Sequence, residues 1–129
     1  PIIYMPDREV DVATGHARIK PARSLLSKLV RRFMKIDPVS SVNPVSSLSI
    51  EGLEVIDTPG HTPGSTSYFM KSDNALFVGD ALVNSKGKLT INKAFTLDQE
   101  RAEQSKQLIL DHEASIILSG HGDVYRKNQ

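Results

Sequence analysis

The stretch DTPGHTPG at residues 57–64 constrains this chain most, because it places a Pro-Gly pair on each side of a single histidine. Each proline fixes its own φ angle, and each glycine permits the positive φ angles that other residues avoid. His61 is therefore predicted to sit in a tight turn that holds its side chain in one direction. A turn of this kind suits a side chain with a fixed target.

Length and composition predict one globular domain over residues 1–129. Apolar residues make up 39% of the chain and charged residues 24%, which is typical of a folded protein. No apolar run reaches the length that a membrane span needs. The lack of cysteine excludes disulfides, thiolate metal sites and cysteine nucleophiles, so a transition metal would need His and carboxylate ligands. A cytoplasmic location is expected.

Local patterns predict a mixture of helices and strands. Apolar residues recur at helical spacing over 21–36, and a second helix is expected over 97–114 with Asp98 as its N-cap. Short strands are expected at 1–5, 48–50, 53–57, 65–70, 75–80 and 115–122. The runs at 48–50 and 53–56 are predicted to pair as a hairpin, and NSKGKLT (84–90) to form an exposed loop.

Three polar residues follow predicted strands at the point where each strand ends. His61 follows LEVID, Asp80 follows ALFVG and His121 follows SIILSG. Strand ends at one edge of a sheet lie close together, so these side chains are expected to converge although 19 and 41 residues separate them. Imidazole and carboxylate are suitable ligands for zinc or iron. Each residue alone also fits a turn or a helix cap, but the three together favour a metal site.

The same stretches resemble the metallo-β-lactamase-fold hydrolases. DTPGHTPGSTSYF, ALFVGDALV and SIILSGHG are similar, in this order, to the third, fourth and fifth motifs of that family. The resemblance implies that His61 is a ligand of one metal and His121 a ligand of a second. Asp80 would bridge the two metals and act as the catalytic residue. An aspartate at this position, rather than a cysteine, resembles the glyoxalase II, lactonase and phosphodiesterase-like branches.

The family's first two motifs, joined as His-x-His-x-Asp-His, have no counterpart here, since His16 is the only histidine before His61. The resemblance therefore implies an α+β fold: the C-terminal portion of a metallo-β-lactamase-type αββα sandwich, with mainly antiparallel strands and flanking helices. Residues 1–129 would form a single, incomplete domain of this type. A sheet without its facing layer should expose apolar strand faces. Self-association, or association with an N-terminal segment, is expected through such a face.

The function that the resemblance implies is metal-dependent hydrolysis of a small-molecule ester, thioester, lactone or phosphodiester, with this isolated chain inactive. The implied cofactor is Zn2+, at one or two sites, with Fe or Mn as alternatives. Asp57, Thr58, Thr62 and Ser119 are candidates to orient the imidazoles, and turn capping explains each equally well. Two other functions stay open: a non-catalytic interaction module on a degenerate scaffold, where the metal can be absent, and a nucleic-acid-processing member of the same fold.

Charge is distributed unevenly, although the net charge is only +1. Residues 12–36 hold seven Lys or Arg and no acidic residue, whereas residues 37–129 hold twelve acidic and eight basic residues. The helix over 21–36 could contact an acidic substrate, RNA or a membrane surface. The favoured interpretation is an apolar stripe docked on the sheet with Arg and Lys in solvent. No membrane partner and no nucleic acid are therefore expected.

Overall fold

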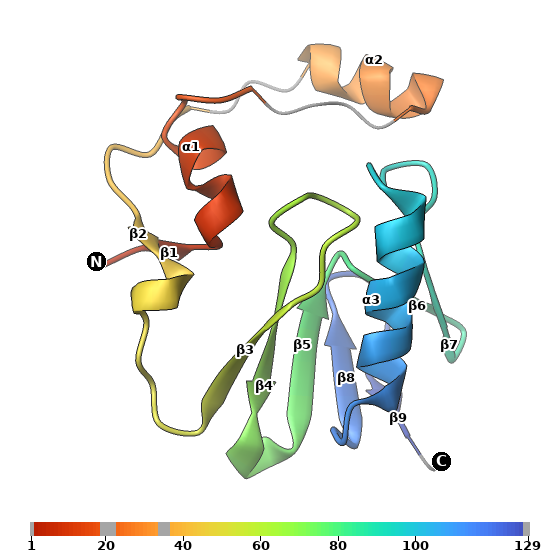
Figure 1. Cartoon of the computed structure of the whole chain (residues 1–129). Helices are drawn as coiled ribbons and strands as arrows, with labels where there is room; N and C mark the ends of the chain where they lie inside the picture. Colours follow the sequence, from red (N-terminus) through yellow and green to blue (C-terminus); the bar gives the residue numbers. More distant parts are fainter. Residues whose placement is uncertain (1, 19–22, 34–36, 128–129) are drawn as a thin grey trace.

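A five-stranded sheet forms the centre of the molecule, and one long helix packs on one of its faces (Figure 1). The structure is a computed structural model that describes residues 2–18, 23–33 and 37–127. Neighbouring strands run antiparallel except for the parallel pair β5 and β8. In spatial order the strands are β3 (Leu53–Asp57), β4 (Thr66–Met70), β5 (Ala75–Gly79), β8 (Ile116–Ser119) and β9 (Tyr125–Arg126). The predicted α+β fold with mainly antiparallel strands is confirmed.

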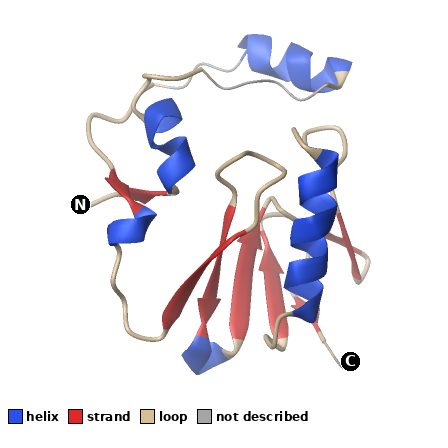
Figure 2. Ribbon diagram, viewed as in Figure 1, coloured by secondary structure: helices blue, strands red, loops and turns tan. Residues whose placement is uncertain are grey.

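Short elements surround this sheet (Figure 2). Before it come β1 (Tyr4–Met5), η1 (Asp7–Glu9), α1 (Val10–Ala13), α2 (Leu25–Phe33), β2 (Asn43–Pro44) and η2 (Val45–Ser47). Between the strands of the sheet, in chain order, come η3 (Lys71–Asp73), the two-stranded hairpin of β6 (Val83–Ser85) and β7 (Lys88–Thr90), and the long helix α3 (Gln99–Asp111). The connection from β5 to its parallel neighbour β8 contains both the hairpin and α3.

The core lies between α3 and the sheet. It contains Phe69, Leu76, Val78, Ala81, Leu82, Leu89, Ile91, Ala102, Ile109, Ala114 and Ile117. The predicted start of α3 is confirmed, because the side chain of Asp98 accepts a hydrogen bond from the backbone N–H of Arg101 at 3.0 Å. Burial of this apolar set is the main source of stability for the fold.

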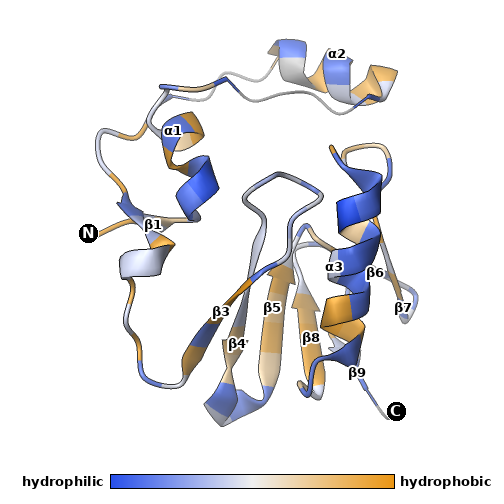
Figure 3. Cartoon of the chain, in the orientation of Figure 1, coloured by the Kyte–Doolittle hydropathy of each residue, from blue (hydrophilic) through white to orange (hydrophobic). Residues whose placement is uncertain are grey.

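The sheet face opposite α3 carries a row of apolar side chains. Strand register places Val55, Tyr68, Phe77 and Leu118 side by side across β3, β4, β5 and β8. Phe77 is 45% exposed and Val55 is 38% exposed. Figure 3 shows β5 and β8 as strongly apolar strands. These exposed strand residues agree with the expectation of an uncovered sheet face.

The prediction of an exposed loop over residues 84–90 is wrong, because these residues form most of the β6–β7 hairpin. Asn84 and Leu89 are buried, so both strands contribute to the interior. The chain reverses at Lys86 and Gly87, which adopt positive φ angles of 52° and 78°. Three-residue strands around a charged turn leave too little alternation to be recognised from sequence.

Two predicted strands also need correction. Residues 48–50 form no strand, because the chain turns there and the Leu53 N–H donates to the carbonyl of Ile50 at 3.2 Å. Of the strand expected over 1–5, residue 1 lies outside the described residues, and within 2–5 only Tyr4–Met5 forms a strand, which pairs in parallel with β2. Short apolar runs of this kind do not distinguish a strand from an extended loop.

The helix expected over 21–36 is α2, of which the structure describes Leu25–Phe33; residues 21, 22 and 34–36 lie outside the described residues. Its apolar stripe was expected to dock on the sheet, and this is wrong. Leu25 is 83% exposed and Phe33 76% exposed, whereas Ser27 is buried. The described part of α2 therefore turns its apolar face to solvent.

Candidate metal centre

The strands β3, β5 and β8 end at the same edge of the sheet, because they run in the same direction. The turn that carries His61 follows β3, Asp80 follows β5, and His121 lies two residues after β8. This edge is at the top of the sheet in Figure 1. The structure therefore brings all three sequence-predicted metal residues to one place.

Asp80 lies between the two histidines, and each imidazole faces a different carboxylate oxygen. His61 Nε2 is 3.8 Å from Asp80 Oδ2, and His121 Nε2 is 3.4 Å from Asp80 Oδ1. Both separations exceed the usual N–H···O length of about 2.9 Å. Two ligands held about 2.1 Å from one tetrahedral ion are about 3.4 Å apart. The spacing thus fits donors that share an ion better than donors that hydrogen-bond directly.

The number of donors is smaller than a metal site needs. Within the described parts of the chain, no group of three or more His, Cys, Asp or Glu side chains is arranged to hold a metal ion. Because each histidine uses its own oxygen of Asp80, the arrangement is two half-sites on one carboxylate. The side chain of His61 is 23% exposed, that of Asp80 47% and that of His121 73%. The edge is therefore open to solvent on the His121 side.

Helix α3 holds one side of the turn that follows β3. Ser105 donates a hydrogen bond from Oγ to the carbonyl of Pro59 at 2.7 Å, and the Asp98 N–H donates to the carbonyl of Gly60 at 2.9 Å. A Cβ atom on Gly60, where φ is +142°, would lie 2.5 Å from the backbone N and Cα atoms of Ala102. Only glycine allows this close approach of the turn to the helix.

Glu9 holds the other side of the same turn. Its Oε1 accepts a hydrogen bond from the Gly64 N–H at 2.8 Å, and a Cβ atom on Gly64 would lie 2.6 Å from Glu9 Cγ. The carbonyl of His61 accepts from the N–H of Leu97 at 3.2 Å. Both Pro-Gly pairs thus serve contacts that fix the histidine between α3 and η1. Sequence reasoning missed Glu9, because 55 residues separate it from its partner.

The loops after β5 and β8 are joined at Asp80. The Gly120 N–H donates to the carbonyl of Gly79 at 2.8 Å. A Cβ atom on Gly120 would lie 2.8 Å from Asp80 Oδ1, so glycine leaves room for the carboxylate there. This contact places the carboxylate beside the strand end that leads to His121.

The hairpin fixes the backbone of His121. The carbonyl of His121 accepts hydrogen bonds from Ser119 Oγ at 2.7 Å and from the Asn84 N–H at 3.2 Å. The Asn84 side chain also donates to the carbonyl of Asp123 at 2.7 Å. Asn84 is a positioning residue that could not be found from sequence, because the hairpin itself was not predicted.

Three of the four residues expected to orient the imidazoles use their side chains in other hydrogen bonds, and the fourth, Asp57, lines the pocket described below. Their hydroxyl groups bond as follows: Thr58 with Ser67 at 2.8 Å, Thr62 with Ser65 at 3.0 Å, and Ser119 with the His121 carbonyl. His61 Nδ1 is buried and has no hydrogen-bond partner among the described residues. A buried polar atom normally has a hydrogen-bond partner. In metal-binding histidines, the ring nitrogen that does not face the metal usually donates a hydrogen bond that fixes the orientation of the ring.

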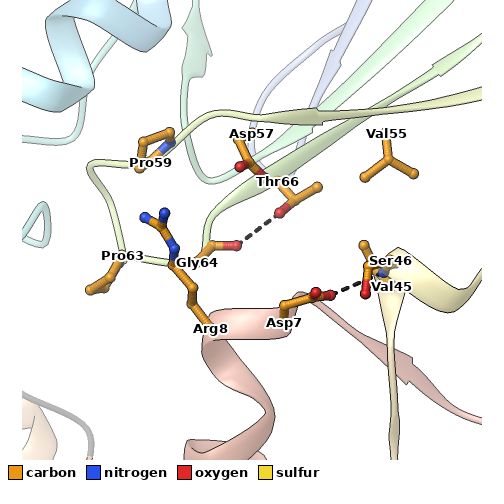
Figure 4. Close-up of a pocket in the computed structure, with 10 residues that line it drawn as sticks. All are labelled: Asp7, Arg8, Val45, Ser46, Val55, Asp57, Pro59, Pro63, Gly64 and Thr66. Atoms are coloured by element: carbon orange, nitrogen blue, oxygen red, sulfur yellow. Dashed lines mark hydrogen bonds between the residues drawn. The ribbon is translucent and has the colours of Figure 1, made fainter.

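A pocket of about 340 Å³ lies beside the turn, on the side of η1 and η2 (Figure 4). Asp7, Arg8 and Asp57 contribute charged groups to its lining, and Arg8 extends towards the turn. Hydrogen bonds from the side chain and backbone of Ser46 lower the pKa of Asp7. The three candidate metal residues are not among its lining residues, although Pro59, Pro63 and Gly64 of the turn that carries His61 are.

Comparisons with known proteins agree with this geometry. The family model described as "Metallo-beta-lactamase superfamily" matches residues 4–121. The probable metallo-hydrolase YflN of Bacillus subtilis (strain 168) is 30% identical, over 93% of this chain and 54% of its own length. The chain thus spans about half the length of this relative.

Solved structures of similar fold include that of TTHA1623 in a di-iron-bound form. It has a TM-score of 0.68 and 18% identity, over 97% of this chain and 59% of the other. The BLEG-1 B3 metallo-beta-lactamase has a TM-score of 0.60 and 27% identity, over the same shares of the two chains.

Proposed function

The chain belongs to the metallo-β-lactamase superfamily, and from this premise we propose that it is part of a cytoplasmic metal-dependent hydrolase. His61, Asp80 and His121 would be among the residues that hold the metal, with Asp80 shared between the two histidines. The observation that carries this proposal is the Asp80 carboxylate, whose two oxygens face two different imidazole nitrogens at 3.8 and 3.4 Å. The chemical nature of the donors suits Zn2+, Fe or Mn. The di-iron-bound form of TTHA1623 supports two metals in a protein of similar fold.

The roles of the residues follow from their positions. Asp80 places its carboxyl group between the two imidazoles, and the turn fixed by α3 and Glu9 keeps His61 from moving away. In such a centre, bound metal ions supply Lewis-acid activation of water and of a carbonyl or phosphoryl oxygen. A complete centre needs more ligands than the described residues bring to Asp80.

The substrate class that we propose is an ester, thioester, lactone or phosphodiester. Asp80 supports this proposal, because a carboxylate in place of a thiolate at this position resembles the glyoxalase II, lactonase and phosphodiesterase-like branches. A metal held by oxygen and nitrogen donors is a hard Lewis acid, which suits the oxygen atoms of these substrates.

Titration with Zn2+ tests the metal proposal directly. The 129-residue chain is stripped of metal, and Zn2+ and Co2+ binding is followed by calorimetry and by the visible spectrum of Co2+. His61→Ala, His121→Ala and Asp80→Asn should each abolish binding or weaken it at least about tenfold, because each removes a donor. His16→Ala is the matched control, since His16 lies in an exposed loop near the N-terminus. Binding that is lost with His16→Ala, or kept in all three site variants, would contradict the assignment.

A chain that binds no metal would support the non-catalytic interaction module instead. The uncovered sheet face provides a surface for that function, and we propose that the chain associates through it with a second copy. Phe77→Ser should convert such a dimer to monomer in light scattering, with Leu108→Ser, at a similarly exposed residue on α3, as the control. A monomeric parent chain would exclude this association.

A further inference from the structure

Helix α2 separates apolar and basic side chains almost completely. At about 100° per residue, Leu25, Leu26, Leu29, Val30 and Phe33 cover roughly 140° of its circumference. All five side chains are exposed. Lys28 and Arg32 flank this arc on the Leu25 side, whereas Ser27, which is buried, lies outside the arc beyond them. The apolar face is therefore turned away from the part of the molecule that covers Ser27.

The sequence that contains α2 is strongly basic. Residues 12–36 carry seven positive charges, from Arg18, Lys20, Arg23, Lys28, Arg31, Arg32 and Lys35, and no negative charge. The rest of the chain from residue 37 has an excess of four acidic residues, since it holds twelve acidic and eight basic side chains. An exposed apolar face with basic flanks is typical of helices that lie in a membrane interface.

We propose that α2 binds the surface of an anionic phospholipid bilayer. Its five apolar side chains would enter the boundary between headgroups and acyl chains, and its basic residues would contact the headgroup phosphates. Charge complementarity favours this occupant over a second copy of the chain, which would bring another basic segment against the first. RNA would satisfy the charges and leave the apolar face in water. The expectation of no membrane partner assumed that the apolar side chains of this helix pack on the sheet. Because these side chains are exposed, that assumption does not hold.

The proposed contact is peripheral. Among the helices that the structure describes, none combines the length and apolarity needed to cross a bilayer. Ser24 fastens the start of α2: its Oγ accepts from the Ser27 N–H at 3.1 Å and donates to the carbonyl of Ala94 at 2.5 Å. The nearby residue Leu97 donates to the carbonyl of His61. The helix thus starts beside the edge of the sheet that carries the candidate metal residues.

Vesicle sedimentation tests this inference on the full 129-residue chain. Vesicles of phosphatidylcholine with about 30% phosphatidylglycerol should bind the chain, and vesicles of phosphatidylcholine alone should bind it much more weakly. The double variant Leu25→Ser/Phe33→Ser should weaken binding about tenfold or more, since it removes the two most exposed apolar side chains of α2. Lys28→Glu/Arg32→Glu should weaken it by at least about twenty-fivefold, at about fivefold for each lost cation, because the two added carboxylates are also repelled by the anionic surface.

Matched variants at other exposed positions separate α2 from general surface effects. Ile50→Ser/Val124→Ser removes exposed apolar side chains elsewhere, and Lys86→Glu/Lys88→Glu reverses charge on the hairpin; neither should change binding. Circular dichroism checks that each variant is folded. Equal binding to both vesicle types, or no binding, would overturn the proposal. A dimer that dissociates in Leu25→Ser/Phe33→Ser, without vesicle binding, would assign the face to a second copy. Metal titration is independent of these readouts.

Discussion

Replacement of Gly60 by alanine should destabilise the chain far more than the same change at Gly52. At Gly60 the φ angle is +142°, and a Cβ atom would lie 2.5 Å from backbone atoms of Ala102, which cannot rotate away. Backbone strain costs about 1–3 kcal/mol, and overpacking adds about 1–3 kcal/mol. The expected loss is therefore about 2–6 kcal/mol, a large share of the roughly 6–19 kcal/mol available to a chain of this length.

Gly52 is the matched control, because it also has a positive φ angle, of +78°. A Cβ atom on Gly52 would have no atom within 4 Å other than those of its chain neighbours. Gly52→Ala should cost only the strain, about 1–2 kcal/mol. Urea unfolding followed by circular dichroism measures both losses on one scale. Gly60→Ala should also weaken Zn2+ binding, since the turn must move away from α3, whereas Gly52→Ala should not. Equal losses of stability for the two variants would refute the close-contact argument.

Three further predictions concern the groups that hold the turn and the N-terminal segment. Ser105→Ala should cost about 1–2 kcal/mol in urea unfolding, because the Pro59 carbonyl loses its donor. Asp98→Ala should cost about 0.5–2 kcal/mol and reduce helicity in circular dichroism, because α3 loses its cap. Asp7 should titrate below 3.8 in an NMR titration, and Ser46→Ala should raise its pKa. Since the folded pKa is lowered, this contribution to stability is present above the usual pKa and is lost as the pH falls through the lowered one.

Local chemistry made the edge of the sheet predictable. Strands that end at glycine or proline located His61, Asp80 and His121, and a single acidic residue before an amphipathic run located the start of α3. The convergence of the three side chains followed, because strands of one sheet share an edge. These inferences need only short-range patterns and the geometry of sheets.

The groups that hold this edge in place could not be predicted in the same way. Glu9 and Gly64 are 55 residues apart, and the 84–90 hairpin contains too few residues for a strand pattern. For α2, the spacing of apolar residues predicted the helix correctly but not which way its apolar face points. Amphipathicity identifies a face, and only the packing of the whole chain decides what that face contacts.

The ammonium group of Lys127 caps the C-terminal end of α3. Lys127 Nζ donates to the carbonyls of Ile109, Leu110 and His112, three acceptors that the helix itself leaves without donors. The N-terminal half of α3 contacts the turn that carries His61, so the same helix contacts Lys127 at one end and this turn at the other. Acetylation of this lysine would remove two of its donor hydrogens and its charge, so carbonyls at this end of α3 would lose their donors.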